Sequence, residues 1–185
     1  MNLLITGGAG YVGSHTVKHL LARGDNVWVY DNLSAGHAAA VPQGRLIVGD
    51  LHDGKLLRDV LRERAIDGVL HFAANSLVGE SVTHPAKYYQ NNVVGSLSLM
   101  EAMRECNVER IVLSSTAAVY GIPRDVPISE DAPRQPCNPY GRTKLAMEQA
   151  LADYACAYGW GVAALRYFNA AGAASDGTRG EDHSP

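Results

Sequence analysis

The stretch TGGAGYVG, residues 6–13, follows the short apolar run LLIT and leads into an amphipathic segment. Gly8, Gly10 and Gly13 match the spacing G-x-G-x-x-G, and Gly7, Gly10 and Gly13 match the looser G-x-x-G-x-x-G. Between a buried strand and a helix, such glycines let a pyrophosphate approach bare backbone at the helix N-terminus, while Gly13 lets helix and strand pack closely. The stretch therefore predicts a dinucleotide-binding turn. The alternative is a glycine-rich turn that holds no ligand.

Apolar, β-branched runs alternate along the chain with longer amphipathic stretches. The strand-like runs cover residues 3–6, 26–30, 45–49, 68–73, 110–115 and 161–168, and the helix-like stretches cover 11–23, 53–64, 86–105 and 140–158. Continuous hydrophobicity in the runs is typical of parallel strands buried on both sides. We therefore predict an α/β fold, a Rossmann-type doubly wound parallel sheet over residues 1–185 with helices on both faces.

Breaks between these segments carry their own signals. Gly24 and Asn107 are typical residues for ending the first helix and the helix over 86–105. Five prolines interrupt residues 121–139, so we predict a long surface loop there that leads into the last helix.

The composition is that of an ordinary globular protein, with 46% apolar residues, 19% charged residues and a net charge of -3. Such a charge offers no general attraction to nucleic acid or to anionic membranes, so we expect neither as a partner. Met1 leads directly into a strand-like run, so we expect no signal peptide and a cytoplasmic location. An odd number of cysteines without C-x-x-C spacing favours reduced thiols at Cys106, Cys137 and Cys156.

Two histidines, His15 and His19, lie four residues apart on the first predicted helix. No glutamate stands between them, and they point away from the stripe that contains Val17 and Leu20. We therefore interpret them as solvated side chains and expect no metal site.

An acidic residue, Asp31, ends the second predicted strand 18 residues after Gly13. A carboxylate at this distance from the glycine turn binds the two ribose hydroxyls of an adenosine and repels a 2′-phosphate. Asn32, Leu33 and Ser34 follow, with no arginine to accept that phosphate. The sequence therefore favours NAD over NADP as cofactor.

Two later strand ends extend the predicted cofactor site. Asp50 follows the third strand, where it can meet the adenine edge or cap the helix over 53–64. The fourth strand ends in His71-Phe72-Ala73-Ala74, and its small residues let backbone approach the middle of a dinucleotide or serve turn packing alone.

Catalytic side chains are predicted where the fifth strand ends, at Ser114-Ser115-Thr116. Tyr140 and Lys144 follow, four residues apart on the helix that Pro139 begins, so the phenol and the ammonium point the same way. A nearby cation stabilises a phenolate, which makes Tyr140 a candidate base, with Thr116 sharing a hydrogen bond with the substrate hydroxyl. A surface Tyr/Lys pair on a helix is the alternative.

In these motifs the sequence resembles the extended short-chain dehydrogenase/reductases. The matching stretches are TGGAGYVGSH (6–15), DNLS (31–34), GDL (49–51), HFAANSLVGESV (71–82), YYQNNVVGSL (88–97), SSTAAVYG (114–121), NPYGRTKLAMEQ (138–149) and LRYFNAAGA (165–173), and they run across nearly the whole chain. Within that family, the combination is most similar to the branch that epimerises UDP-glucose and UDP-galactose.

The resemblance implies which residues line the sites. For NAD they are Tyr11, Val12, Asp31, Asn32, Asp50, Leu51, Phe72, Ala73, Ala74, Asn75, Ser76, Asn91 and Phe168, beside the glycines and with Tyr140 and Lys144. Thr116, Tyr140 and Lys144 are implied to be catalytic, and Asn169 to meet a UDP-sugar substrate together with Thr116 and Tyr140. Many relatives carry a lysine in place of Ser76, and others carry a serine in place of Thr116. A homodimer is plausible.

One local feature separates the possible reactions. Related 4,6-dehydratases need an acid-base pair directly after the threonine, whereas this chain has Ala117-Ala118. Without that pair a 4-keto intermediate can only return, so we predict epimerisation at C4 through a transient ketone. The chain ends where the family's C-terminal sugar-binding part is expected to begin. The alternatives are another epimerase or a decarboxylase of nucleotide sugars, or an NAD-binding module without turnover.

Overall fold

The computed structural model describes residues 1–182 and contains a six-stranded parallel sheet. Its strands are β1 (Asn2–Thr6), β2 (Asn26–Asp31), β3 (Leu46–Val48), β4 (Gly68–His71), β5 (Arg110–Thr116) and β6 (Gly161–Tyr167). They lie in the order β3-β2-β1-β4-β5-β6, and every neighbouring pair is parallel. The winding reverses between β1 and β4, which confirms the predicted doubly wound sheet.

Six α-helices connect the strands: α1 (Tyr11–Ala22), α2 (Gly54–Glu63), α3 (Val78–Thr83), α4 (Pro85–Tyr88), α5 (Gly95–Glu105) and α6 (Pro139–Tyr158). Short 3-10 turns cover Ala38–Ala40 (η1) and Ala117–Tyr120 (η3). The start of α6 is fixed by its proline and by Asn138, whose side chain accepts a hydrogen bond from the Gly141 N–H at 2.8 Å. Gly159, at φ 72°, ends it.

The prediction of one helix over 86–105 is wrong in its middle. Here α4 passes into a π-helix, η2 (Tyr89–Val94), before α5 begins. A π-turn admits an extra residue into the helix, and such turns are frequent at functional sites. The apolar pattern of the segment does not reveal it, because the polar anchor that accompanies it, Asn92, is bound by residues distant in the sequence.

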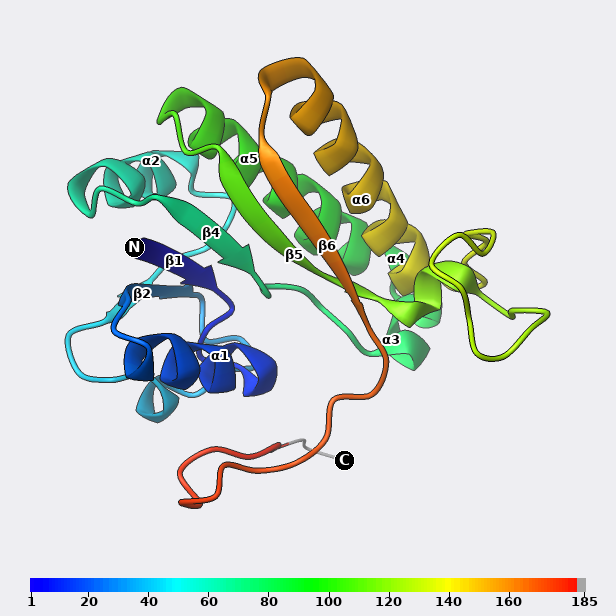
Figure 1. Ribbon diagram of the computed structural model, residues 1–185, viewed down its shortest axis with the longest axis horizontal. Helices are drawn as coiled ribbons and strands as arrows, with labels where there is room; N and C mark the ends of the chain where they lie inside the picture. Colours follow the sequence, from blue (N-terminus) through cyan, green and yellow to red (C-terminus); the bar gives the residue numbers. More distant parts are fainter. Residues whose placement is uncertain (183–185) are drawn as a thin grey trace.

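Side chains of alternate strand residues enter two separate cores. On one face, Ile5, Val27 and Val29 pack with Val17 and Leu20 of α1. On the other face, the larger core joins α2, α5 and α6 to the sheet through Leu4, Leu57, Leu99, Met103, Leu113 and Met147. Figure 1 shows α1 on one side of the sheet and α2, α5 and α6 on the opposite side.

Coverage of the two faces is unequal. Within residues 1–182, α1 is the one α-helix on its side, and it lies against β1 and β2. Residues 161–165 of β6 are exposed, among them Val162 and Leu165. The segment after β6 runs past the end of α1, where the Tyr11 hydroxyl donates to the Gly172 carbonyl and Lys18 pairs with Asp176 (Figure 1).

The expectation that both histidines of α1 are solvated holds only for His19, which is exposed. His15 is half-buried and meets the ring of Tyr11 edge-on, with ring centroids 5.3 Å apart. Helical spacing places His15 away from the sheet. The same spacing places the His15 ring one turn from Tyr11, which covers part of it.

No helix within residues 1–182 has the length and apolar character needed to cross a bilayer. The three cysteines are all unpaired thiols.

Replacing Gly13 with alanine tests whether the glycine turn depends on the missing side chain. A Cβ at this position would lie 2.2 Å from the Gly7 carbonyl oxygen and 2.8 Å from the Gly8 Cα, both backbone atoms that cannot move independently. We expect Gly13→Ala to lower the free energy of unfolding by about 2–4 kcal/mol in urea denaturation. Gly79→Ala is the matched control, since a Cβ there meets no atom within 4 Å. Equal stability of the two variants would contradict the packing argument.

Candidate active site

A groove follows the carboxyl ends of β1, β2, β3 and β4. Its lining contains Gly7, Gly10, Tyr30, Asp31, Asn32, Ser34, Ala35, Gly36, Gly49, Asp50, Leu51, Phe72, Ala73, Ala74, Asn75 and Asn91. Gly7 adopts φ +70°, and a Cβ on it would lie 2.5 Å from the Ala73 nitrogen, so the glycine turn packs directly on the end of β4. The groove thus exposes backbone rather than side chains at its centre.

Asp31 provides the negative charge at one wall of this groove. Its carboxylate accepts hydrogen bonds from the Ala9 N–H at 2.9 Å and from the Leu33 N–H at 2.8 Å. These two donors fix the carboxylate, and each oxygen retains a lone pair for a further donor. Lysine and arginine are absent from the described lining of the groove. The wall is therefore suited to neutral hydroxyl groups rather than to a phosphate.

Asp50 does not cap α2, which settles the alternative that the sequence leaves open. The cap is Asp53, whose side chain accepts from the Leu56 N–H at 2.9 Å. Asp50 instead lies at the groove and accepts from the His52 backbone N–H at 3.0 Å and from Asn32 Nδ2 at 2.9 Å. These bonds, the His52 backbone N–H foremost, lower the pKa of Asp50 to about 2, so it stays ionised.

A buried hydrogen-bond chain lies directly beneath the end of β4. Thr6 Oγ1 is 2.6 Å from His71 Nδ1, and His71 Nε2 is 2.7 Å from Ser96 Oγ. Ser96 donates its own hydroxyl proton to the Asn92 carbonyl. Ser96 must therefore accept from an Nε2–H of His71, which leaves Nδ1 to accept the Thr6 hydroxyl proton. The ring is neutral in this arrangement, because burial, with the nearby Lys144 charge, lowers the pKa of His71 to about 3.

Asn92 of the π-helix joins the groove to the helix that carries the candidate base. Its Oδ1 accepts from the Asn75 N–H at 2.8 Å, and its Nδ2 donates to the Asn75 carbonyl at 3.0 Å. The same Nδ2 donates to Thr143 Oγ1 at 3.1 Å, and Thr143 donates to the Tyr140 carbonyl at 2.7 Å. Both polar atoms of this buried amide are thus used to hold backbone at the two ends of the site.

The candidate catalytic groups meet where β5 ends. The Thr116 hydroxyl accepts from the Ala118 N–H at 3.1 Å and lies close enough to the Tyr140 phenol to act on its pKa. Lys144, 4% exposed, donates from Nζ to the Ser114 carbonyl at 2.7 Å. Burial raises the pKa of Tyr140, while Thr116 acts in the opposite direction. Burial lowers the pKa of Lys144 to about 8, so the ammonium form persists at neutral pH.

Most of the residues predicted to bind the cofactor lie along the groove. Seven of them do not, namely Tyr11, Val12, Gly13, Ser76, Tyr140, Lys144 and Phe168, and Asn169, which is predicted to meet the substrate, also lies outside it. Gly13 lies buried beneath the turn, Val12 is half-buried in α1, and the Tyr11 hydroxyl is bonded to Gly172. Ser76, Phe168 and Asn169 are exposed outside the groove lining.

Several lining residues escaped the sequence analysis: Tyr30, Ser34, Ala35, Gly36 and Gly49. Gly36 carries a usable signal, since a glycine shortly after the acidic strand end lets the loop touch the glycine turn. A Cβ on Gly36 would lie 2.7 Å from the Ala9 carbonyl carbon. His71 and Asn92 have no comparable sequence signal, because their roles depend on partners from other elements.

Comparison with known proteins identifies the family to which this fold belongs. Residues 3–184 match the NAD dependent epimerase/dehydratase family. A protein named UDP-glucose 4-epimerase from Lactobacillus helveticus is 53% identical over 186 residues, which is 100% of this chain and 56% of that protein. The crystal structure of UDP-glucose 4-epimerase from Brucella ovis in complex with NAD has a TM-score of 0.96 at 51% identity and covers 98% of this chain.

A third similar protein is the UDP-glucose 4-epimerase from Stenotrophomonas maltophila, solved with bound NAD and formylated UDP-arabinopyranose. It is 41% identical, with a TM-score of 0.96, and covers 100% of this chain. The chain spans a little over half the length of these relatives, 56% to 57%.

The buried neutral state of His71 predicts sensitivity to acid. In the folded protein His71 stays neutral down to about pH 3, whereas the unfolded chain binds the proton near pH 6.5. Acid therefore favours unfolding, and His71 should lower the free energy of unfolding by about 5 kcal/mol between pH 6.5 and pH 3. Urea denaturation at several pH values measures this slope. We expect a flatter slope for His71→Gln and an unchanged one for His19→Gln, an exposed histidine of α1; equal slopes for both would exclude His71 as the cause.

Proposed function

This chain belongs to the NAD dependent epimerase/dehydratase family, and we propose from that premise that it forms the cofactor-binding, catalytic half of a UDP-glucose 4-epimerase. The observation that carries the proposal is the arrangement at the end of β5, where Thr116 lies beside Tyr140 and buried Lys144, one turn further along α6, donates to the Ser114 carbonyl. The names of the similar proteins support UDP-glucose and UDP-galactose as the substrate pair.

The groove fits the NAD that the family requires. Backbone at Gly7 and Gly10 is bare where a pyrophosphate would approach the start of α1, and a Cβ on Gly7 would collide with the Ala73 backbone and displace this turn. The fixed carboxylate of Asp31 suits the adenosine ribose hydroxyls, and Asp50 with Leu51 suits the adenine edge. Phe72, Ala73, Ala74, Asn75 and Asn91 would follow the cofactor toward its reactive end. When bound, NAD supplies a nicotinamide ring that accepts a hydride and returns it.

In the proposed reaction the protein moves one proton. Tyr140 takes the proton of the substrate's C4 hydroxyl, and Thr116 holds that hydroxyl in line with the phenol. The ammonium of Lys144 on the same face of α6 stabilises the resulting phenolate. When the keto-sugar has turned its opposite face to the site, Tyr140 returns the proton to O4 and the epimer is complete.

Epimerisation is favoured over elimination by the two residues that come directly after Thr116. Ala117 and Ala118 form the start of η3, and neither side chain can give or take a proton. A dehydratase needs such groups at this position to expel water from the sugar. Without them the ketone is reduced again rather than consumed.

We propose that the sugar pocket is shared with a further part of the protein. Asn169 and Phe168 are exposed just after β6, where they are free to meet a nucleotide-sugar and the cofactor. The similar proteins are longer than this chain, and their additional portion is the natural source of the remaining sugar contacts. Residues 1–185 would then supply the cofactor site, the base and part of the substrate site.

The proposal extends to assembly and location. The segment over residues 77–97 carries exposed apolar side chains at Leu77, Val78, Val82, Tyr89, Val94 and Leu97, and we propose that a second copy covers them in a homodimer. Unpaired thiols at all three cysteines suit the cytoplasm, which we propose as the location.

Titration with both dinucleotides tests the cofactor assignment. The charge of Asp31 and the lack of a cation along the described groove disfavour a 2′-phosphate, so we expect NAD to bind at least about tenfold more tightly than NADP. Isothermal calorimetry on the complete gene product measures both affinities. Asp153→Asn, on the exposed side of α6, should leave the ratio of NAD affinity to NADP affinity unchanged. Asp31→Asn should bring the two affinities closer together. Tighter binding of NADP by the unmodified protein would exclude the assigned role of Asp31.

Replacement of the phenol tests the base. We expect Tyr140→Phe to slow the interconversion of UDP-glucose and UDP-galactose by about 10²-fold or more, because the O4 proton loses its acceptor. NAD affinity should stay within about twofold, since the cofactor groove is formed by other residues. Tyr158→Phe, at the exposed end of the same helix, is the control and should turn over normally. If unmodified protein binds NAD but converts neither sugar, the chain is a cofactor-binding module or acts on another nucleotide-sugar.

A further inference from the structure

A buried carboxylate, Glu148, lies one helical turn beyond Lys144 on α6 and takes no part in the proposed proton transfer. Its side chain is 4% exposed. Oε1 accepts the Ser115 hydroxyl at 2.5 Å, and Arg166 of β6 donates from Nε to Oε1 at 3.0 Å and from Nη2 to Oε2 at 2.8 Å. A carboxylate this buried is stable only when paired and hydrogen-bonded, and here it is both.

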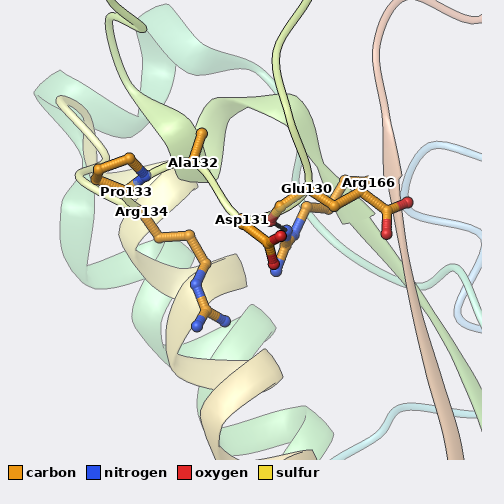
Figure 2. Close-up of a pocket in the computed structure, with 6 residues that line it drawn as sticks. All are labelled: Glu130, Asp131, Ala132, Pro133, Arg134 and Arg166. Carbon is orange, nitrogen blue, oxygen red and sulfur yellow. Dashed lines mark hydrogen bonds between the residues drawn. The ribbon is translucent and has the colours of Figure 1, made fainter.

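The same arginine fixes the loop that precedes α6. Arg166 Nη1 donates to the Tyr120 hydroxyl at 2.6 Å and to the Glu130 carbonyl at 3.1 Å. Figure 2 shows Arg166 reaching from β6 to the loop at Glu130, with Arg134 on the same loop. Arg134 adds a second positive charge, with Nη1 3.6 Å from Glu148 Oε2. Glu148 therefore connects α6 to β5, to β6 and to the loop at one point.

The position of Glu148 matters because it belongs to a row of polar contacts between α6 and the end of β5. Tyr140, Lys144 and Glu148 follow one another at four-residue intervals on α6 and so share a face. They contact Thr116, the Ser114 carbonyl and Ser115, three consecutive residues at the end of β5. This row of contacts begins at Tyr140 and Thr116 and ends at Glu148.

We propose that Glu148 is a positioning residue for the reaction, which sets the separation of Tyr140 and Thr116 by fixing α6 against the end of β5. This inference rests on the proposed function of Tyr140 as the base. With Glu148 in place, α6 is held at two successive turns, through Lys144 and through Glu148. Without it, α6 keeps its contacts with Asn92 and the core but loses one of its two polar contacts with the end of β5, so the separation between Thr116 and Tyr140 increases.

The test uses two variants of Glu148 that separate position from charge. Glu148→Gln keeps the length of the side chain and removes its charge, so Ser115 and Arg166 lose their ionic partner. Glu148→Asp keeps the charge and shortens the side chain by one methylene. If position is what matters, we expect both variants to lower kcat by about 10-fold or more with KM and NAD affinity within about twofold. Asp153→Asn, on the exposed side of α6, is the control for a carboxylate lost from this helix.

A second measurement does not depend on turnover. In protein without cofactor, tyrosine ¹³Cζ NMR follows the ionisation of Tyr140, whose signal is assigned through Tyr140→Phe. Thr116 and Tyr88 lie against Tyr140, with the ring centroids of the two tyrosines 6.5 Å apart, and Lys144 is one turn further along α6 with its Nζ on the Ser114 carbonyl. A greater separation between Thr116 and Tyr140 supports the phenolate less, so both variants should raise the pH at which Tyr140 ionises. Loss of negative charge alone would lower that pH in Glu148→Gln and leave Glu148→Asp unchanged, which would overturn the proposal.

A purely structural role also gives a distinct result. Glu148→Gln would then lower the melting temperature, while kcat and the Tyr140 ionisation stay at their original values in the folded protein, and this would overturn the proposal. The proposed function fails separately, when the unmodified protein converts neither UDP-glucose nor UDP-galactose. The NMR measurement still reads the effect of Glu148 on Tyr140 in that case.

Discussion

The burial of the Lys144 ammonium is the constraint around which the site is arranged. A charge that is 4% exposed requires close polar partners, and within residues 1–182 its hydrogen-bond acceptor is the Ser114 carbonyl at the end of β5. Every ionisable neighbour must then tolerate a nearby cation. His71 does so by staying neutral, with the Nε2–H form imposed by Thr6 and Ser96. A second positive charge at this depth would be costly, so the neutral chain beneath β4 is a condition for the buried lysine.

Two kinds of contact form the site at the carboxyl edge of the sheet. Around the glycine turn the contacts are between backbone atoms, and the absence of side chains at Gly7 and Gly13 shapes the groove. At the end of β5 the contacts are between side chains and backbone carbonyls, and they fix α6. Asn92 joins the two regions, because its amide holds Asn75 at the groove and Thr143 on α6. The position of α6 and the backbone of the groove at Asn75 are thereby fixed by the same buried amide.

The fold and the principal site residues follow from local sequence, and the supporting residues do not. Buried strands, the glycine turn and the Tyr-x-x-x-Lys spacing are each encoded within a few residues, so the sheet and the candidate base could be predicted. Whether Asp50 or Asp53 caps α2 depends on where the helix begins, and the hydrogen bond to Leu56 decides it. The roles of His71, Asn92 and Glu148 depend on partners 17 to 65 residues away. Polar residues with such partners have no periodic pattern, and the π-helix at Asn92 is hidden by an ordinary apolar spacing.

Whether the proposed reaction ends in epimerisation or elimination depends on acid and base side chains, and these are missing directly after the end of β5. Tyr140 and Thr116 can remove and restore one proton, which suffices to form a ketone and to reduce it again. Expulsion of water from the sugar requires a second acid or base beside it, and the positions directly after Thr116 hold the methyl groups of Ala117 and Ala118. The buried carboxylate of α6, Glu148, is fully engaged by Ser115 and Arg166 and cannot serve as that group. A ketone formed there has no acid-base pair that could expel water from it, and when hydride and proton return instead, reversal at C4 is the change that the cycle leaves behind.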